Sequence, residues 1–171
     1  MKDLRKIIYI SLLTTIALVL SLIESMIPIP VPIPGARLGL SNLVILSTLV
    51  VFGFSYSLSV GVLKSLLLVL ITGSVTSVFY SLTGSIISIV VMALAYKYLS
   101  KYLSLIGVSV LGSVAHNFSQ VLVGSLILNN FKLFLYLPLL MILGLFTGIF
   151  VGLSSIYVSK QLKVVLKKEL R

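Results

Sequence analysis

Few side chains in this sequence can carry chemistry, and most of them lie in two apolar segments. Lys64 is in the middle of a long apolar stretch, where an ionised group costs roughly 2.5–3.5 kcal/mol on membrane-insertion scales. His116 and Gln120 are four residues apart and therefore share one face of a helix, with Asn117 one step around it. We expect these residues to line a ligand site or a water-filled cavity. The alternatives are a Lys64 ion pair with Glu24 and a histidine that only bonds a neighbouring helix.

A proline-rich segment, residues 28–42, contains the other polar candidates. Its four prolines alternate with other residues, which favours extended or polyproline II backbone. Arg37 and Asn42 follow the prolines, and the neighbouring Gly35 and Gly39 allow the backbone to fold inward. The segment is therefore predicted to be a loop that covers a site. The alternative for the arginine is a simple anchor at the membrane surface.

Arg37, Lys64 and His116 would together suit an anion that arrives from the outer side. Guanidinium and ammonium groups bind phosphate or carboxylate, while the imidazole and the nearby amides would orient the bound molecule. Tyr80, with Phe79 beside it, is expected to form an aromatic wall of the same site or part of the aromatic belt at the membrane surface.

The composition argues against several classes of enzyme. The chain has no cysteine and only three acidic residues, so we expect neither thiol chemistry nor the carboxylate-bound magnesium of diphosphate chemistry. Its single histidine is too few for a typical transition-metal site. It has neither a Gly-x-Ser-x-Gly motif nor a phosphate-binding Gly-rich loop. We therefore predict no catalytic site, no metal and no cofactor.

Membrane helices must position these residues. The chain is 59% hydrophobic and 9% charged, whereas about a quarter of the residues in a soluble domain are charged. We expect one transmembrane domain over residues 1–171, with a basic head at 1–6 and a basic tail at 159–171. An all-α bundle of six helices is predicted for the ranges 7–27, 40–52, 56–71, 77–96, 105–128 and 133–158. The second helix is short for a full span unless residues 35–39 lie at membrane depth.

Basic residues predict how the chain is oriented in the membrane. With the N-terminus inside, the cytoplasmic segments hold ten Lys and Arg residues, and the outer loops hold only Arg37 and Lys132. This is the asymmetry of the positive-inside rule. We therefore expect a multi-pass protein of the plasma membrane with both termini in the cytoplasm. The net charge of +10 then suits the anionic inner membrane surface, and nucleic acid is not an expected partner.

Small residues recur at helical spacing, as they do where membrane helices approach closely. Three of them, here called the glycine ladder, predict a contact within the chain: Gly144, Gly148 and Gly152. Two pairs in the first helix are candidates for contact with a partner subunit: Ser11 with Thr15, and Ala17 with Ser21.

Several motifs resemble those of a known family. They are P-G-A-R-L-G-L-S-N at 34–42, the lysine-bearing third helix, S-L-T-G-S at 81–85 and A-H-N-F-S-Q at 115–120. Over nearly its whole length the chain resembles a small membrane family called heptaprenyl diphosphate synthase component I, or the Gx transporter family. That family is similar in size, topology and helix pattern to the S components of energy-coupling factor (ECF) transporters, which are six-helix vitamin-capture proteins.

The resemblance implies a pocket that faces outward beneath the first outer loop. It also implies a first helix that packs on a transmembrane coupling subunit, which two separate ATPases power. In S components this contact uses an Ala-x-x-x-Ala type motif, and this chain has only the two pairs named above in its place. We therefore expect the substrate-binding subunit of an ECF-type importer. Its solute would be small and anionic or amphiphilic, such as a quinone or isoprenoid precursor or a vitamin.

Two other functions stay open at this point. The family name suggests a non-catalytic accessory subunit of a heptaprenyl diphosphate synthase. A structural subunit of a membrane redox complex is the third, although no cofactor motif supports it. For the importer, the residues expected to bind the solute are Arg37, Asn42, Lys64, Tyr80, His116, Asn117 and Gln120.

Overall fold

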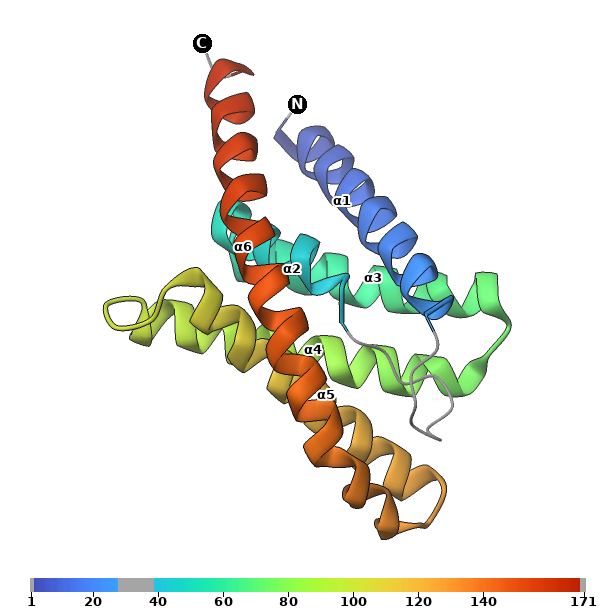
Figure 1. The fold of residues 1–171 in the computed structure, drawn as a ribbon. Coiled ribbons are helices and arrows are strands. Elements are labelled where there is room, and N and C mark those ends of the chain that lie inside the picture. The colour runs from blue at the N-terminus through green and yellow to red at the C-terminus, as the bar shows by residue number, and fades with distance from the viewer. Residues whose placement is uncertain (1, 28–38, 170–171) are drawn as a thin grey trace.

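A computed structural model gives the fold and describes residues 2–27 and 39–169 (Figure 1). These residues form six α-helices and one 3-10 helix, and none of them is in a β-strand. In chain order the elements are α1 (Lys2–Ser25), α2 (Asn42–Phe52), α3 (Phe54–Thr72), α4 (Val75–Leu99), α5 (Leu105–Ile127), the 3-10 helix η1 (Phe131–Tyr136) and α6 (Leu137–Glu169). Most of the predicted covering loop, residues 28–38, lies outside the described residues.

Five segments of the described chain are long and apolar enough to cross a membrane, namely α1, α3, α4, α5 and η1 with α6. The helix α2 differs, because its 11 residues extend only about 16 Å against a hydrocarbon core of about 30 Å. The prediction of six helices is therefore confirmed, and the prediction of six full spans is corrected to five candidate spans and one short helix. Apolar helices in this number indicate a multi-pass membrane protein.

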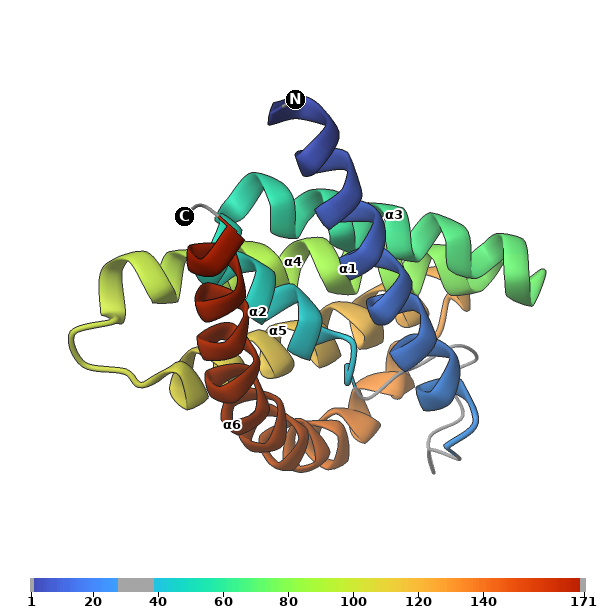
Figure 2. The ribbon, with the colours of Figure 1, turned by 90° about the horizontal axis from the view of Figure 1, so that it is seen from above.

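Short connections make successive helices antiparallel. In Figures 1 and 2 the α2–α3 and α4–α5 connections lie on one side of the molecule, and the α3–α4 and α5–η1 connections lie on the opposite side. The turn between α2 and α3 consists of Gly53 alone, whose φ of 91° suits glycine. The short α2 therefore reverses the chain direction as a full span would. At the other end of the chain, the predicted basic tail is not separate, because α6 continues through it to Glu169.

The helix α2 lies at the centre of the bundle and packs against each of the other five α-helices. Its residues Ile45, Leu46 and Leu49 form the largest apolar core with Ile89 and Met92 of α4. A helix that is apolar on all sides is stable only when it is surrounded in this way. The bundle is thus arranged around a short helix, and the first residues of this helix lie in the interior of the bundle.

The glycine ladder brings α5 and α6 into close contact, as predicted. A Cβ atom added to Gly148 would lie 2.8 Å from the Cα atom of Val110, and one added to Gly152 would lie 2.6 Å from the Cα atom of Ile106. Only a residue without a side chain lets the two backbones approach this closely.

We predict that Gly148→Ala destabilises the protein, because the backbone of Val110 cannot move without separating α5 from α6. Overpacking of this kind costs about 1–3 kcal/mol, and each kcal/mol lowers the Tm of a chain of this size by about 2–4 °C. Thermal unfolding of the purified protein in detergent, followed by circular dichroism, measures the change.

Gly107→Ala is the matched control. The added Cβ atom would meet only the flexible side chain of Leu103, at 3.1 Å, and alanine favours a helix more than glycine does. Equal Tm values for the two variants would contradict the proposed backbone contact.

Candidate functional site

Polar side chains from four helices meet at the N-terminal end of α2. We call this group of residues and the glycines between them the polar cluster: Glu24, Gly39, Ser41, Asn42, Lys64, Gly84, His116 and Gln120. All of its side chains that carry a polar group are at most 2% exposed. In a membrane bundle, polar groups buried to this extent mark a site or a structural hydrogen-bond network.

Lys64 reaches the start of α2 from the middle of α3. Its Nζ atom donates a hydrogen bond to the Oγ atom of Ser41 at 3.0 Å. Ser41 immediately precedes α2 and has helical backbone angles. The lysine therefore points into the protein and away from lipid, which is where an ion within a membrane is least costly.

Glu24, near the end of α1, binds the backbone just before α2. One oxygen of its carboxylate accepts a hydrogen bond from the N–H group of Gly39. Gly39 has a φ of 90°, and a Cβ atom there would lie 2.9 Å from the Nδ2 atom of Asn42. Both the backbone conformation and the lack of space require glycine at this position. The predicted pairing of Glu24 with Lys64 stays a prediction.

The imidazole of His116 lies in a narrow space between two glycines. A Cβ atom on Gly84 would be 2.7 Å from its Cε1 atom, and a Cβ atom on Gly39 would be 3.5 Å from its Cδ2 atom. The Nε2 atom of the ring lies 2.9 Å from the Nε2 atom of Gln120, one turn further along α5. The ring thus links α5 to α4 and to the residues that precede α2.

Asn42 differs from the rest of the polar cluster in that both polar atoms of its side chain have unused hydrogen-bonding capacity. Its Oδ1 and Nδ2 atoms are both buried without a hydrogen-bond partner among the described residues, and the residue is 1% exposed. Leaving a buried polar group unsatisfied costs about 1–3 kcal/mol, so such a group in a native structure requires an explanation. The partial positive charge at the start of α2 lies beside the same amide. Asn42 therefore presents a donor and an acceptor that suit a bound polar molecule.

Three predicted site residues are not placed in the polar cluster. Tyr80 is buried in an apolar group with Val121 and Leu140. Asn117 donates a hydrogen bond from its Nδ2 atom to the carbonyl oxygen of Leu140 at 2.6 Å, within the α5–α6 contact. Arg37 lies outside the described residues. The other four predicted residues all belong to the polar cluster.

Sequence reasoning did not assign a site role to Ser41, Gly84 or Glu24. The first two are inside motifs that carried the family resemblance, G-L-S-N and S-L-T-G-S, so a signal was present. Glu24 was considered only as a counter-ion, because nothing in the sequence indicates that its partner is the N–H group of Gly39. Among the described residues, no three His, Asp or Glu side chains gather as ligands for a metal. The chemistry that this arrangement supports is the binding of a polar molecule.

The two small-residue pairs of α1 lie on different faces. Ser11 and Thr15 are exposed, and the Oγ1 atom of Thr15 donates to the carbonyl oxygen of Ser11 at 2.9 Å. Ala17 and Ser21 are fully buried, and Ala17 packs against Val44 of α2. A partner subunit can therefore reach the first pair, whereas the second pair is occupied by the helices of the chain itself.

We predict the tautomer of His116, the only histidine of the chain. Because an amide nitrogen donates, the His116 Nε2 atom accepts from Gln120 and the imidazole proton is on Nδ1. Nuclear magnetic resonance of protein labelled with ¹⁵N-histidine distinguishes the two tautomers by the shifts of the ring nitrogens. An Nε2–H tautomer would contradict this geometry and would place the carbonyl oxygen of Gln120 against the ring.

Two glutamine variants complete this experiment. Gln120→Leu removes the donor and is expected to shift both ring nitrogen resonances. Gln161→Leu, on the exposed part of α6, is the control and is expected to leave both resonances unchanged.

Residues 13–158 match a family model described as heptaprenyl diphosphate synthase component I. No curated protein and no solved structure matches the chain. The matched region includes the whole polar cluster and at least part of every helix. The chain therefore belongs to the heptaprenyl diphosphate synthase component I family.

Proposed function

We propose that the chain is the solute-binding membrane subunit of an ECF-type importer and that the polar cluster is its binding site. The observation that carries this proposal is the buried amide of Asn42, both of whose polar atoms lack a partner among the described residues. A site for a polar solute explains why such a group is kept at the centre of an apolar bundle.

The length of α2 supports the same site. In many transporters the substrate binds near the middle of the membrane, where a short or broken helix presents the positive end of its dipole. The 11 residues of α2 begin at the polar cluster, with Lys64 adjacent to its first turn. A helix N-terminus and an ammonium group both favour an anion.

The proposed solute is small and is anionic or amphiphilic. Lys64 neutralises its carboxylate or phosphate, while His116, Gln120 and Asn42 orient it through hydrogen bonds. Arg37, in the segment before Gly39, is proposed as a second cation. A vitamin or a quinone or isoprenoid precursor agrees with these requirements.

The proposed partners are a transmembrane coupling subunit and two ATPases. Ser11 and Thr15, on the exposed face of α1, are proposed to contact the coupling subunit. The proposed orientation in the plasma membrane has both termini in the cytoplasm, because ten of the basic residues then lie inside. Figure 1 is compatible with this arrangement, since the start of α1 and the end of α6 lie at the same end of the molecule.

We predict that Lys64→Met abolishes solute binding while the protein still inserts. Methionine has a similar length but no charge, so the variant loses the attraction for the anion and its hydrogen bond to Ser41. Bound molecules are released from the purified protein by denaturation and identified by mass spectrometry. The expected result is a compound that is present in the original protein and at least about tenfold depleted in the variant, which corresponds to about 1.4 kcal/mol.

Lys132→Met is the matched control, because Lys132 is exposed, lies in η1 and is not a member of the polar cluster. It is expected to retain the compound. Equal retention by both variants would remove Lys64 from the site.

A second function is favoured by the family name, which describes a component of a heptaprenyl diphosphate synthase. In that case the chain is a non-catalytic membrane subunit that binds a soluble prenyl synthase. Co-expression with an ECF module and, separately, with a prenyl synthase distinguishes the two functions. The importer predicts stable co-purification with the module, and pairing with the synthase alone would overturn it.

Green fluorescent protein fused to the C-terminus fluoresces only if the tail is cytoplasmic, so a dark fusion would contradict the proposed orientation.

A further inference from the structure

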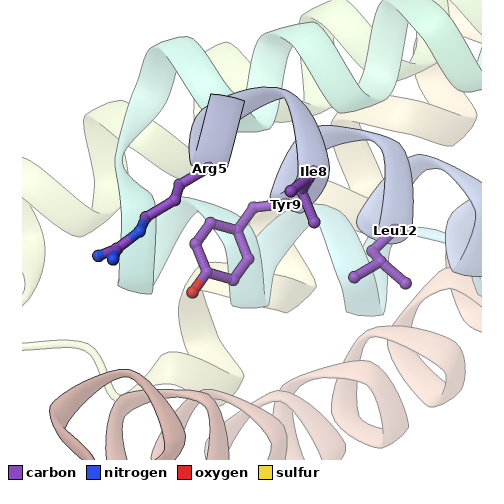
Figure 3. Close-up of a pocket in the computed structure, with 4 residues that line it drawn as sticks. All are labelled: Arg5, Ile8, Tyr9 and Leu12. Carbon is purple, nitrogen blue, oxygen red and sulfur yellow. The ribbon is translucent and has the colours of Figure 1, made fainter. Parts of the chain in front are cut away.

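A cavity of about 430 Å³ lies at the start of α1, far from the polar cluster along that helix (Figure 3). Its described lining residues are Arg5, Ile8, Tyr9 and Leu12. Figure 3 shows the side chains of Arg5 and Tyr9 extending from α1 toward the side on which α6 passes. The cavity does not contain any member of the polar cluster, and the proposed function does not use it.

The lining changes from charged to apolar along the helix axis. Leu12 is seven residues after Arg5, which places it about 10 Å deeper. The ring of Tyr9 forms one wall of the cavity. The centroid of this ring is 5.3 Å from the centroid of the Phe52 ring in α2. A charged entrance with an apolar slot of this depth matches the headgroup and the first part of an acyl chain of a phospholipid.

The cavity is open to lipid because the backbones of α1 and α6 do not approach one another closely among the described residues. The helix α1 packs only on α2 and α3 in this part of the structure. Ile8 and Leu12 remain 48% and 56% exposed, so their outer surfaces are available to an acyl chain.

The charges at this end of the molecule favour an anionic lipid. The first turns of α1, which carry Arg5 and Lys6, lie at the same end of the molecule as the last turns of α6 (Figure 1). Those turns carry Lys160, Lys163 and Lys167, which are all exposed and share one face of the helix at this spacing. Basic pockets between membrane helices bind the headgroups of anionic lipids, each basic residue near the surface contributing about 1 kcal/mol.

We propose that this cavity is a binding site for one anionic phospholipid of the phosphatidylglycerol type. The guanidinium group of Arg5 binds its phosphate through paired N–H donors. One acyl chain lies along Ile8 and Leu12 in the space between α1 and α6. This site is independent of the solute site, and it holds whichever of the two functions is correct.

The absence of tryptophan from the chain makes a direct test possible. Leu12→Trp introduces the only tryptophan at the apolar wall, where the exposed position accepts a larger side chain. The variant is reconstituted into phosphatidylcholine vesicles that contain increasing fractions of either dibrominated phosphatidylglycerol or dibrominated phosphatidylcholine. Bromine quenches tryptophan at contact, and both lipids carry it at the same acyl carbons, so the ratio of the two quenching curves does not depend on depth.

We expect phosphatidylglycerol to quench Trp fluorescence of the Leu12→Trp protein at a severalfold lower mole fraction than phosphatidylcholine. Adding Arg5→Gln is expected to reduce this preference by about fivefold, because one basic residue contributes about 1 kcal/mol to the binding of an anionic lipid. Adding Lys101→Gln instead, in the exposed α4–α5 connection, is the control for general surface charge and is expected to leave the preference unchanged.

A second reporter controls for the general attraction of anionic lipid to a basic protein. Phe79→Trp, on α4, replaces a side chain that is 53% exposed and should show equal quenching by the two lipids. Equal quenching at position 12, or a preference that Arg5→Gln does not reduce, would overturn the proposal. A preference for phosphatidylglycerol at position 12 that the isolated chain shows, and that is lost when a coupling subunit is added, would support the proposal. It would mean that the lipid occupies the cavity in the isolated chain.

Discussion

An ammonium group inside a membrane protein has to be kept away from lipid. The position of the Lys64 ammonium group therefore determines much of how the helices of this bundle are arranged. Its partner is Ser41, directly before α2, so the first turn of α2 must lie at the depth of the middle of α3. That depth leaves room for only a short helix before the chain turns at Gly53. The remaining helices then surround α2, because a short apolar helix with polar groups at one end cannot face lipid with that end.

Close approach of backbones is the second condition for this arrangement. The glycine ladder lets α6 lie directly on α5, and Gly84 lets the imidazole of His116 lie against α4. The hydrophobic effect provides little attraction between helices in lipid, so these close contacts carry much of the packing energy. The same small residues that stabilise the bundle therefore also bring α5 close enough for its histidine and glutamine to meet the start of α2.

The helices and part of the polar cluster could be predicted from the sequence, for different physical reasons. Apolar stretches bounded by glycine and basic residues are strong signals, and spacing alone placed His116 and Gln120 on one face. The position of Asn117 outside the polar cluster was less predictable. A position one step around the helix faces α6 in this structure, and only the packing of α5 on α6 decides that. Tyr80 likewise lies in an apolar group with residues of α5, η1 and α6, and no local pattern in the sequence contains such long-range packing.

The helical continuation of the basic tail also determines how deep the bundle sits in a membrane. From Leu137 to Ser159 the helix α6 has no charged residue and rises about 34 Å, close to the thickness of the hydrocarbon core. The lysines that follow in the same continuous helix are costly to place in the hydrocarbon core. A shift of α6 into the core by one helical turn would bury Lys160. The match between the apolar length of α6 and the thickness of the hydrocarbon core thus sets the depth of the whole protein in the membrane. A bilayer of different thickness would tilt this helix, and the tilt would change how far below the surface the start of α2 lies.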